Sequence, residues 1–386
     1  MIKKTTRSRF AGQADKILRA AGQWRRFLPL GMAFGVPQIL RADNHVDYRY
    51  EYYKEDANRM TIETHSVYFE QKLLDSLTAK GELVYDGISG ATPTGGYDGS
   101  GKPVTTQLTD TRRAGNLELD WQLGNHTLSP GFADSRESDY ESRGVSFGDA
   151  IAFNDKNTIL QFGVDHNFDS VRHSDRITWS DKDQTDVIIG LSQILSPKDI
   201  FNVAFTYGYE SGYLNDPYRQ ITFNISGFAY PEIRPGYRSK EVLFTSLTHF
   251  FDSINASLEG SYRFHHDSYD IFSHTVGLTW HQWLGKHVIV EPMFRFYAQT
   301  SASFYHLSVD GFFPSDPFPR PPYYSADYRL SEFYSLDYGL QVTGVINDHV
   351  RVVAGYHRYE MNGLDNTPGA AYPQANVFTV GFSILW

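Results

Sequence analysis

Charged residues at alternate positions are the groups in this chain that are best spaced to act together on a solute. Several segments alternate apolar and polar residues, and the polar positions of one segment would share one face of a β-sheet. Along the wall of a channel, such charges would select ions or solutes. In the plugged barrel that a wide interior also permits, they would instead form a polar network that fills or braces the inside. The candidates for this lumen-lining face are Glu118, Asp120, Asp165, Glu259, Arg263, Glu291, Arg295, Asp337 and Arg351.

The run His-His-Asp-Ser at residues 265–268 is a second group with the composition for chemistry, either a metal site or a Ser–His–Asp hydrolase. Neighbouring residues in a strand point to opposite faces, so two adjacent histidines cannot both bind one ion without a bend. A triad requires partners that meet in space, and sequence spacing assembles none. We interpret this run, and the similar run at 173–175, as polar strand ends or loops, and we predict no catalytic residue and no metal ligand.

Cysteine usage narrows the chemistry further. The sequence contains no Cys, which excludes disulfides, thiolate metal sites and the usual attachment of c-type haem. The same feature suits a protein that passes through an oxidising compartment. We expect no cofactor and no enzymatic activity.

Composition indicates which elements would position the charged residues. Aromatic residues make up 15% of the chain, yet its mean hydropathy is −0.42. A membrane-spanning helix needs about 20 apolar residues in sequence, and such a run is missing here. A barrel strand needs an apolar residue only at every second position. The sequence therefore predicts an all-β fold, namely an antiparallel transmembrane β-barrel.

Alternation is clearest at the end of the chain, in residues 374–386. Phe378, Val380 and Phe382 fall on one face of this segment, and Thr379 falls on the other. Similar segments recur from residue 46 onward, separated by connections that are short and long in turn. Short turns on one side and long loops on the other are typical of outer-membrane barrels.

The turns set the expected number of strands. Seven short turns join fourteen strands, and one further strand at each end gives about 16, with fourteen as the alternative. The barrel would occupy residues 43–386 as a single domain, because closing it requires the whole wall. The predicted strands are 46–55, 61–74, 77–87, 111–124, 127–137, 142–153, 158–168, 183–194, 200–210, 240–251, 254–266, 270–284, 287–299, 329–346, 349–361 and 374–386. The predicted long loops are 88–110, 169–182, 211–239, 300–328 and 362–373.

Two of these loops, 211–239 and 300–328, are rich in proline and aromatic residues. Proline fixes the backbone and lowers the entropy of a loop. Such loops would stand stiffly over the barrel mouth, fold into it, or dock a partner, unless they merely pack on themselves.

The N-terminal 42 residues have the order of an export signal. They hold nine basic residues and one acidic residue, with an apolar run at 27–40 and the small residue Ala42 at the end. This order is typical of a cleavable signal peptide. The remaining chain has 26 of the 35 basic residues and 44 of the 45 acidic residues, a formal net charge of −18. Nucleic-acid binding requires the opposite sign, so we expect no nucleic-acid partner.

The last strand ends on alternating large residues, Phe382, Ile384 and Trp386. A terminal aromatic residue of this kind resembles the signal that the outer-membrane assembly machinery reads in many barrels. We therefore expect that machinery and outer-membrane lipid as partners, and the outer membrane of a Gram-negative-type bacterium as the location.

Four stretches carry a further resemblance. They are residues 48–56 (beginning Tyr-Arg-Tyr-Glu-Tyr-Tyr), 128–138 (Leu-Ser-Pro-Gly-Phe-Ala-Asp-Ser-Arg-Glu-Ser), 230–235 (Tyr-Pro-Glu-Ile-Arg-Pro) and 325–331 (Ser-Ala-Asp-Tyr-Arg-Leu-Ser). The set resembles a family of bacterial outer-membrane β-barrels catalogued as a domain of unknown function, over most of the chain after the signal. The resemblance implies a periplasmic lipoprotein or redox partner, and it brings no catalytic assignment.

These observations favour a non-enzymatic, porin-like barrel. It would act as a pore for small solutes or as a membrane scaffold for a periplasmic or surface partner. The alternatives are an outer-membrane hydrolase with loop-borne catalytic residues and a secreted, soluble β-rich binding protein.

Overall fold

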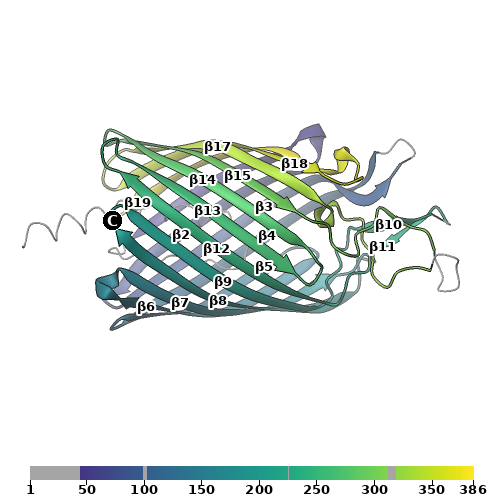
Figure 1. The fold of residues 1–386 in the computed structure, drawn as a ribbon, viewed down its shortest axis with the longest axis horizontal. Coiled ribbons are helices and arrows are strands. Elements are labelled where there is room, and N and C mark those ends of the chain that lie inside the picture. Colours follow the sequence, from purple (N-terminus) through teal and green to yellow (C-terminus); the bar gives the residue numbers. More distant parts are fainter. Residues whose placement is uncertain (1–43, 99–101, 225, 312–318) are drawn as a thin grey trace, which may run out of the picture.

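Sixteen antiparallel strands close into one barrel in the computed structural model (Figure 1). The structure describes residues 44–98, 102–224, 226–311 and 319–386. The barrel strands are β1 (His45–Glu55), β2 (Thr61–Leu74), β3 (Leu77–Tyr97), β4 (Pro103–Leu123), β5 (His126–Arg136), β6 (Tyr140–Phe153), β7 (Thr158–Arg172), β8 (Trp179–Ser196), β9 (Asp199–Gly212), β12 (Tyr237–Phe251), β13 (Ala256–Asp267), β14 (Phe272–Leu284), β15 (Val288–Gln299), β17 (Phe333–Val345), β18 (Val350–Gly363) and β19 (Gln374–Leu385).

Alternation of apolar and polar residues makes these segments strands, because only one face of the wall meets lipid. In β19, Phe378, Val380 and Phe382 lie exposed on the outside of the barrel, whereas Thr379 between them is buried. Aromatic rings of neighbouring strands meet on the outer face, as where the rings of Tyr48 and Phe382 lie 5.5 Å apart. The outer face of the wall therefore carries a band of apolar and aromatic side chains.

The strands follow one another around the wall, and β1 pairs with β19 to close it. The closing register places His45 opposite Leu385 and Glu55 opposite Ala375. All the described barrel strands are thus paired on both sides, which satisfies the backbone groups that lipid cannot. The predicted strand count of 16 is confirmed, and the alternative of fourteen strands is wrong.

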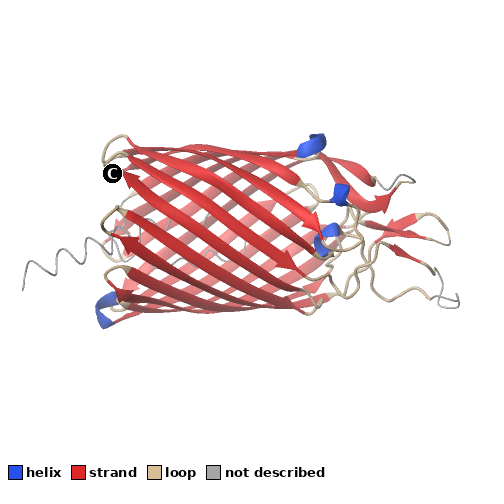
Figure 2. Ribbon diagram, turned by 45° about the horizontal axis from the view of Figure 1, so that its top comes forward, coloured by secondary structure: helices blue, strands red, loops and turns tan. Residues whose placement is uncertain are grey.

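The two ends of the barrel differ. One end has tight turns, such as those that use Gly124 and Gly285 in the left-handed conformation (φ +65° for each), and the C-terminus lies at this end (Figure 1). Long connections gather at the other end (Figure 1). Figure 2 shows that the described helical segments are single short turns beside the strands. They are η2 (Asp56–Asn58), η3 (Asn154–Lys156), η4 (Tyr328–Leu330) and η5 (Gly369–Ala371).

The β3–β4 hairpin corrects the predicted loop at 88–110. β3 continues to Tyr97 and β4 begins at Pro103, so the hairpin extends beyond its neighbours. Glycine-rich composition concealed the strand. Gly90 has a φ of +132°, and a Cβ there would lie 2.1 Å from the carbonyl oxygen of Arg59, so this strand position accepts only glycine.

Apolar cores lie in the long connections at the outer end. A three-stranded sheet of β10 (Gln220–Phe223), β11 (Ala229–Pro231) and β16 (Ser308–Val309) projects beyond the barrel (Figure 1). It joins the connection after β9 to the connection after β15. Its buried core contains Ile221, Phe223, Val309, Tyr324 and Ala326. β17 begins at residue 333 instead of the predicted 329, because η4 occupies residues 328–330.

Among the described residues, no helix has both the length and the apolar character needed to cross a membrane. The predicted signal peptide, residues 1–42, lies outside the described residues.

Candidate functional site: the barrel interior and its outer mouth

The inner face of the wall carries the polar candidates. On β4, Leu117 and Trp121 are exposed on the outer face, and Glu118 and Asp120 alternate with them. The register between strands carries this parity around the barrel. By that parity the interior face includes Glu118, Asp120, Asp165, Glu259, Arg263, Glu291, Arg295, Asp337 and Arg351.

Two of the acidic candidates on β4 share one cation. Lys80 on β3 forms an ion pair with Asp120, and its Nζ lies 4.0 Å from Glu118. The hydroxyl of Ser129 on β5 also donates to Asp120 at 2.6 Å. This part of the wall is therefore braced across three strands and retains part of its negative charge.

A buried polar network braces the wall near the short turns. Nδ1 of His281 and Oε1 of Glu291 lie 2.6 Å apart, and both side chains are almost fully buried. Gln341 donates to the other oxygen of Glu291 at 2.8 Å, and Thr248 donates to Glu259 at 3.2 Å. Here the interpretation of the candidates as a bracing network fits the contacts.

Higher in the barrel, β13 and β15 present cations to the interior. The guanidinium carbon of Arg263 lies 5.7 Å from the ring centre of Phe244. Arg295 is exposed to solvent although it faces inward. Asp337, which is opposite Arg295 in register, lies 2.6 Å from Nδ1 of His357. Water therefore reaches the middle of the wall at Arg295.

Two carboxylates lie side by side on another part of the inner wall, where β7 and β8 pair. Asp165 and Asp186 are directly opposite in register. Asp165 accepts a hydrogen bond from Asn167 at 3.3 Å. Like charges in this arrangement repel, so negative potential concentrates on this side of the interior.

Away from its two ends, the inner face of β5 and β6 is lined by small side chains. The positions between the outward residues of β5 and β6 are Ser129, Gly131, Ala133, Ser135, Ser142, Gly144, Ser146, Gly148 and Ala150. Side chains of this size reach only a short distance from the backbone. These residues therefore add little side-chain volume to the interior.

Strand order places this small-residue wall across the barrel from the cations. In a closed ring of sixteen strands, the opposite strand is eight places away, and the strand eight places from β5 is β15. Arg295 on β15 therefore lies on the side of the ring opposite β5. The interior combines a small-residue side, a cationic side and the Asp165–Asp186 side.

The outer mouth is crossed by the connections after β9 and β15, which a buried ionic network joins. Asp327 is 1% exposed and lies at its centre. Nη2 of Arg234 donates to Asp327 at 2.8 Å, Nε of Arg329 lies 2.9 Å from both of its oxygens, and Nε of Arg219 lies 3.5 Å away. Burial alone would raise the pKa of Asp327, but the charges of Arg329 and Arg219 outweigh it and hold the pKa far below its usual range.

A second buried carboxylate extends this network. Glu232 forms an ion pair with Arg234 at 2.6 Å and accepts a hydrogen bond from the hydroxyl of Ser325. The backbone N–H of Asp216 donates to Glu232 at 2.7 Å, and the Asp216 side chain pairs with Arg329. Burial raises the pKa of Glu232, against the charge of Arg234. The two connections are thus joined by two buried carboxylates, Asp327 and Glu232, and by arginines of which Arg219 and Arg234 are largely buried and Arg329 is exposed.

A cavity of about 510 Å³ lies between these connections and the barrel wall. Its lining includes the cations Lys182 and Arg238 from the wall and the rings of Tyr140, Tyr269 and Tyr297. Lys182 is 3.6 Å from Asp169, and Arg238 pairs with Asp267. The cavity is polar, partly aromatic and open, so it could hold a small polar solute at the mouth.

The run at residues 265–268 does not form a catalytic or metal arrangement. His265 faces inward, where its Nε2 lies 3.3 Å from Asp267, while His266 faces outward and lies 3.2 Å from Glu241. The hydroxyl of Ser268 accepts from the backbone N–H of Ser239. His173 stacks on Tyr213 with ring centres 3.9 Å apart.

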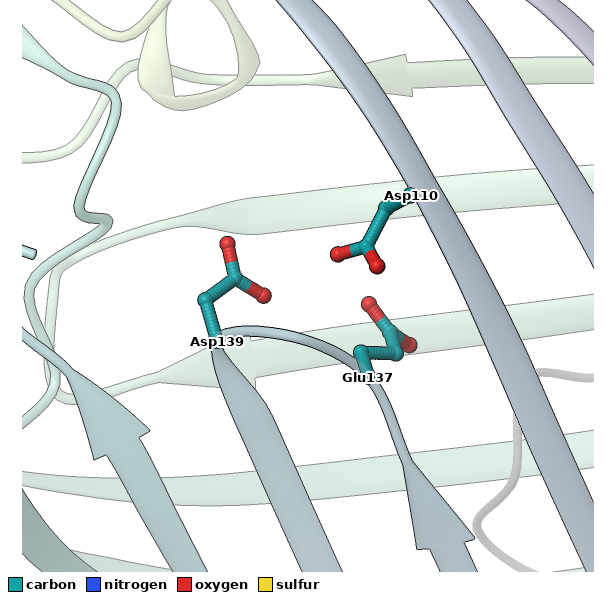
Figure 3. A group of neighbouring side chains, drawn as sticks. All are labelled: Asp110, Glu137 and Asp139. Atoms are coloured by element: carbon teal, nitrogen blue, oxygen red, sulfur yellow. The ribbon is translucent and has the colours of Figure 1, made fainter.

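Three carboxylates at the outer rim could bind a cation, and the sequence did not single them out. Asp110, Glu137 and Asp139 place one oxygen each within 4.8 Å of one another (Figure 3). Ser138 already donates to Asp110 at 2.7 Å, and Tyr218 donates to Asp139. Burial raises the pKa of Glu137 to about 7, with Arg112 opposing and Asp139 adding to the rise. These hydrogen bonds indicate that the three carboxylates anchor the β9–β12 connection at the rim.

The sequence did not single out the arginines at the mouth, although two of the quoted stretches contain two of them, Arg234 and Arg329. Residues 230–235 supply Glu232 and Arg234, and residues 325–331 supply Asp327 and Arg329. Each stretch pairs an acid with a base two residues apart. That spacing was the available signal.

The C-terminal residues Phe382, Ile384 and Trp386 lie exposed on the outer face. The backbone N–H of Trp386 donates to the carbonyl of Asn44 at 2.9 Å, at the seam of the barrel. Recognition of these three residues by the outer-membrane assembly machinery stays a prediction.

A family model described as "Protein of unknown function (DUF3570)" matches residues 35–100, 98–180 and 172–379. No curated protein matches the chain in sequence. Similar solved structures share its fold at low identity. CdiB from Acinetobacter baumannii has 7% identity and a TM-score of 0.50, over 89% of this chain and 60% of that one. A bacterial polysaccharide outer membrane secretin has 10% identity and a TM-score of 0.45, over 90% and 99%.

The siderophore receptor PirA from Pseudomonas aeruginosa has 11% identity and a TM-score of 0.44, over 89% of this chain and 62% of the receptor. The chain thus spans about three fifths of the receptor and of CdiB. These similarities concern the barrel fold alone.

Proposed function

The chain belongs to the DUF3570 family of unknown function, and from this premise and its barrel fold we propose that it is a narrow aqueous channel. It would pass small polar solutes across the outer membrane of a Gram-negative-type bacterium. Its short turns would face the periplasm and its long connections the outside, as in other outer-membrane barrels. The channel would be non-enzymatic.

The observation that carries the proposal is the small-residue inner face of β5 and β6, which lies across the interior from the solvent-exposed Arg295. A barrel that only braced its interior would fill this space with large side chains, as small barrels do. Here most inner residues of β5 and β6 are no larger than serine, and the solvent-exposed cation Arg295 lies on the opposite side of the ring. Small uncharged side chains opposite a solvent-exposed cation support a wet path.

A solute would meet the outer mouth first. The ionic network around Asp327 holds the two connections in place, so the entrance is narrowed by a rigid structure. The cavity beneath, with Lys182, Arg238 and tyrosine rings, would hold the solute before it passes Arg295. Cations on β13 and β15 and carboxylates on β7 and β8 would orient a polar solute across the lumen.

Single-channel recording tests the proposal. The full-length protein purified from membranes, in detergent, is added to a planar bilayer, with heat-modifiable gel mobility as the check of folding. We expect discrete conductance steps that are smaller than those of a wide, unobstructed barrel of sixteen strands. Folded protein that inserts and remains electrically silent would contradict the channel.

A scaffold for a surface partner is the second candidate, favoured by the three-stranded sheet that projects beyond the barrel (Figure 1). A buried core makes this sheet a rigid platform, and Phe228 beside it is 68% exposed. A silent but folded barrel that retains a partner after cross-linking in cells would support this candidate. A periplasmic lipoprotein or redox partner remains an expectation from the family resemblance.

The other two functions considered, a soluble binding protein and a hydrolase, fit the structure less well. The apolar outer face does not suit a soluble secreted binding protein, because water would meet its band of apolar and aromatic side chains. A hydrolase would need a serine, a histidine and an acid in one place, and the run at 265–268 does not supply them.

A further inference from the structure

Three arginines form a cluster on the outer face of β4, β5 and β6, at the end of the barrel with the long connections. Arg113 on β4 lies directly opposite Arg136 on β5, and Arg143 on β6 lies directly opposite Asp134. All three side chains are exposed, Arg136 and Arg143 by 59% and 62%. They share the parity of the lipid-facing residues.

The depth of the arginine cluster corresponds to the edge of the apolar band. β5 ends at Arg136, while Phe132 and Val145 pair one level below Arg143 and are both exposed. Leu117 on β4 is exposed at the same level. On the lipid face of a barrel, an arginine costs about 2–4 kcal/mol at the midplane and about 0–1 kcal/mol near the interface. The cluster therefore occupies the level where lipid headgroups begin.

Acidic neighbours only partly neutralise the arginine cluster. Arg136 donates to Asp134 at 3.1 and 3.3 Å, and Arg143 lies 3.7 Å from the same carboxylate. Glu141 is opposite Arg136 in register. Three guanidinium groups thus face two carboxylates, and Arg113 and Arg136 repel each other across the strand pair. An anion between the arginines would relieve this repulsion.

Two other basic residues on the outer face of this rim, Arg358 and His166, each lie near an acidic side chain. Arg358 pairs with Asp56 at 2.6 Å and with Glu360 at 3.4 Å. His166 lies 3.7 Å from Asp183 on the neighbouring strand. An excess of positive charge over acid at β4–β6 contrasts with the negative charge of the chain after residue 42.

We propose that the arginine cluster binds a phosphate group of lipid A, the anionic glycolipid of the outer leaflet. Guanidinium groups match phosphate oxygens in pairs and are the side chains best suited to this contact. The acyl chains of the same lipid would lie on Leu117, Phe132 and Val145 below. This inference rests on the proposed orientation of the barrel in the outer membrane, and it is independent of channel activity.

Native mass spectrometry of the full-length protein, purified in mild detergent, tests this site. The double variant Arg136→Gln/Arg143→Gln removes both positive charges and leaves a polar amide on a shorter side chain. Lys54→Gln removes a single exposed cation elsewhere on the same rim and serves as the matched control. We expect the wild type and Lys54→Gln to retain lipid A, and the double variant to retain about tenfold less, since each lost charged hydrogen bond weakens binding.

Added lipids provide the second measurement, the thermal shift of each purified variant. Lipid A with its phosphates should stabilise the wild type, and dephosphorylated lipid A or phosphatidylglycerol should not. Equal retention by the double variant, or equal stabilisation by any of these lipids, would overturn the lipid A site. A protein that binds lipid A but shows no conductance would refute the proposed channel and support this site. A protein that conducts but does not bind lipid A would refute this site and support the channel.

Discussion

The outer mouth and the β5–β6 wall show two opposite uses of the barrel interior. At the mouth, buried carboxylates pair with arginines and join two long connections around Asp327. Along the middle of β5 and β6, the inner side chains are small and uncharged. The connections therefore fill the barrel interior with paired charged groups at the mouth, whereas the strands contribute little side-chain volume along the β5–β6 wall.

Energetics explain why the mouth would be rigid. Removing one member of a buried ionic network leaves its partners charged and unpaired, which costs about 3–5 kcal/mol. The small-residue wall has no such penalty, because it holds no buried charge on β5 or β6. Substitutions at the mouth should therefore act on loop stability, and substitutions on the wall should act on conductance.

The largest effect is expected for Asp327→Asn. This change leaves Arg219, Arg234 and Arg329 without their shared carboxylate, at a cost of about 3–5 kcal/mol to the closed connections. Limited proteolysis of the folded barrel should cut residues 211–236 much faster than in the wild type, and conductance should rise. Asp348→Asn in an exposed short turn is the control. Unchanged proteolysis would show that the network does not hold the mouth.

Ser146→Trp should lower single-channel conductance by about half or more, because a large ring then fills the space in front of the small-residue wall. Val145→Trp is the matched control, since the neighbouring residue faces lipid. The gel mobility of both folded variants should remain heat-modifiable. Equal conductance of the two variants would place the conducting path elsewhere.

A smaller effect, on selectivity, is expected for Arg295→Glu. Exchanging the exposed interior cation for an anion should shift the zero-current potential in a salt gradient toward cation permeation, by about a few-fold in the permeability ratio. Lys54→Glu makes the same charge change on the outside of the barrel. A similar shift in both variants would assign the effect to surface charge and contradict a path beside Arg295.

The smallest effect is expected for Glu137→Gln at the rim. The folded pKa of Glu137, about 7, lies above its ordinary value of 4.5. Its contribution to stability is therefore present below about pH 4.5 and is lost as pH rises through about 7. Glutamine should stabilise the protein against denaturant at pH 8 by about 1 kcal/mol, after allowance for screening, and have little effect at pH 4.5. A gain equal at both pH values would contradict the raised pKa.

The strands were predicted correctly where contact with lipid requires an apolar residue at every second position. All sixteen barrel strands overlap the predicted segments, because the wall is one residue thick and each position has one environment. Prediction failed at residues 88–97, where Gly90 and Gly95 interrupt the period. The start of β17 was also placed too early, since tertiary contacts of Asp327 and Arg329 stabilise η4.

The positions of the candidate site residues, too, could be predicted where they follow the alternation of the strands, and were missed where they lie in the connections. Alternation identified the interior positions, such as Arg295 and Glu291, without revealing that one is exposed to water and the other is buried against His281. The acid–base spacing in residues 230–235 and 325–331 showed paired charges in each loop. That these loops pair with each other depends on the barrel, which brings positions 93 residues apart in sequence into contact.

The sequence alone is sufficient to predict a membrane barrel, its number of strands and the face that each strand residue takes, because these follow from local periodicity and turn spacing. Which charges meet, which of them water reaches, and the position of the small residues of β5 across from Arg295 are visible in the folded barrel alone. Those features depend on ring closure, which sets distances between strands that are remote in sequence. The local pattern of residues along one strand does not indicate such distances.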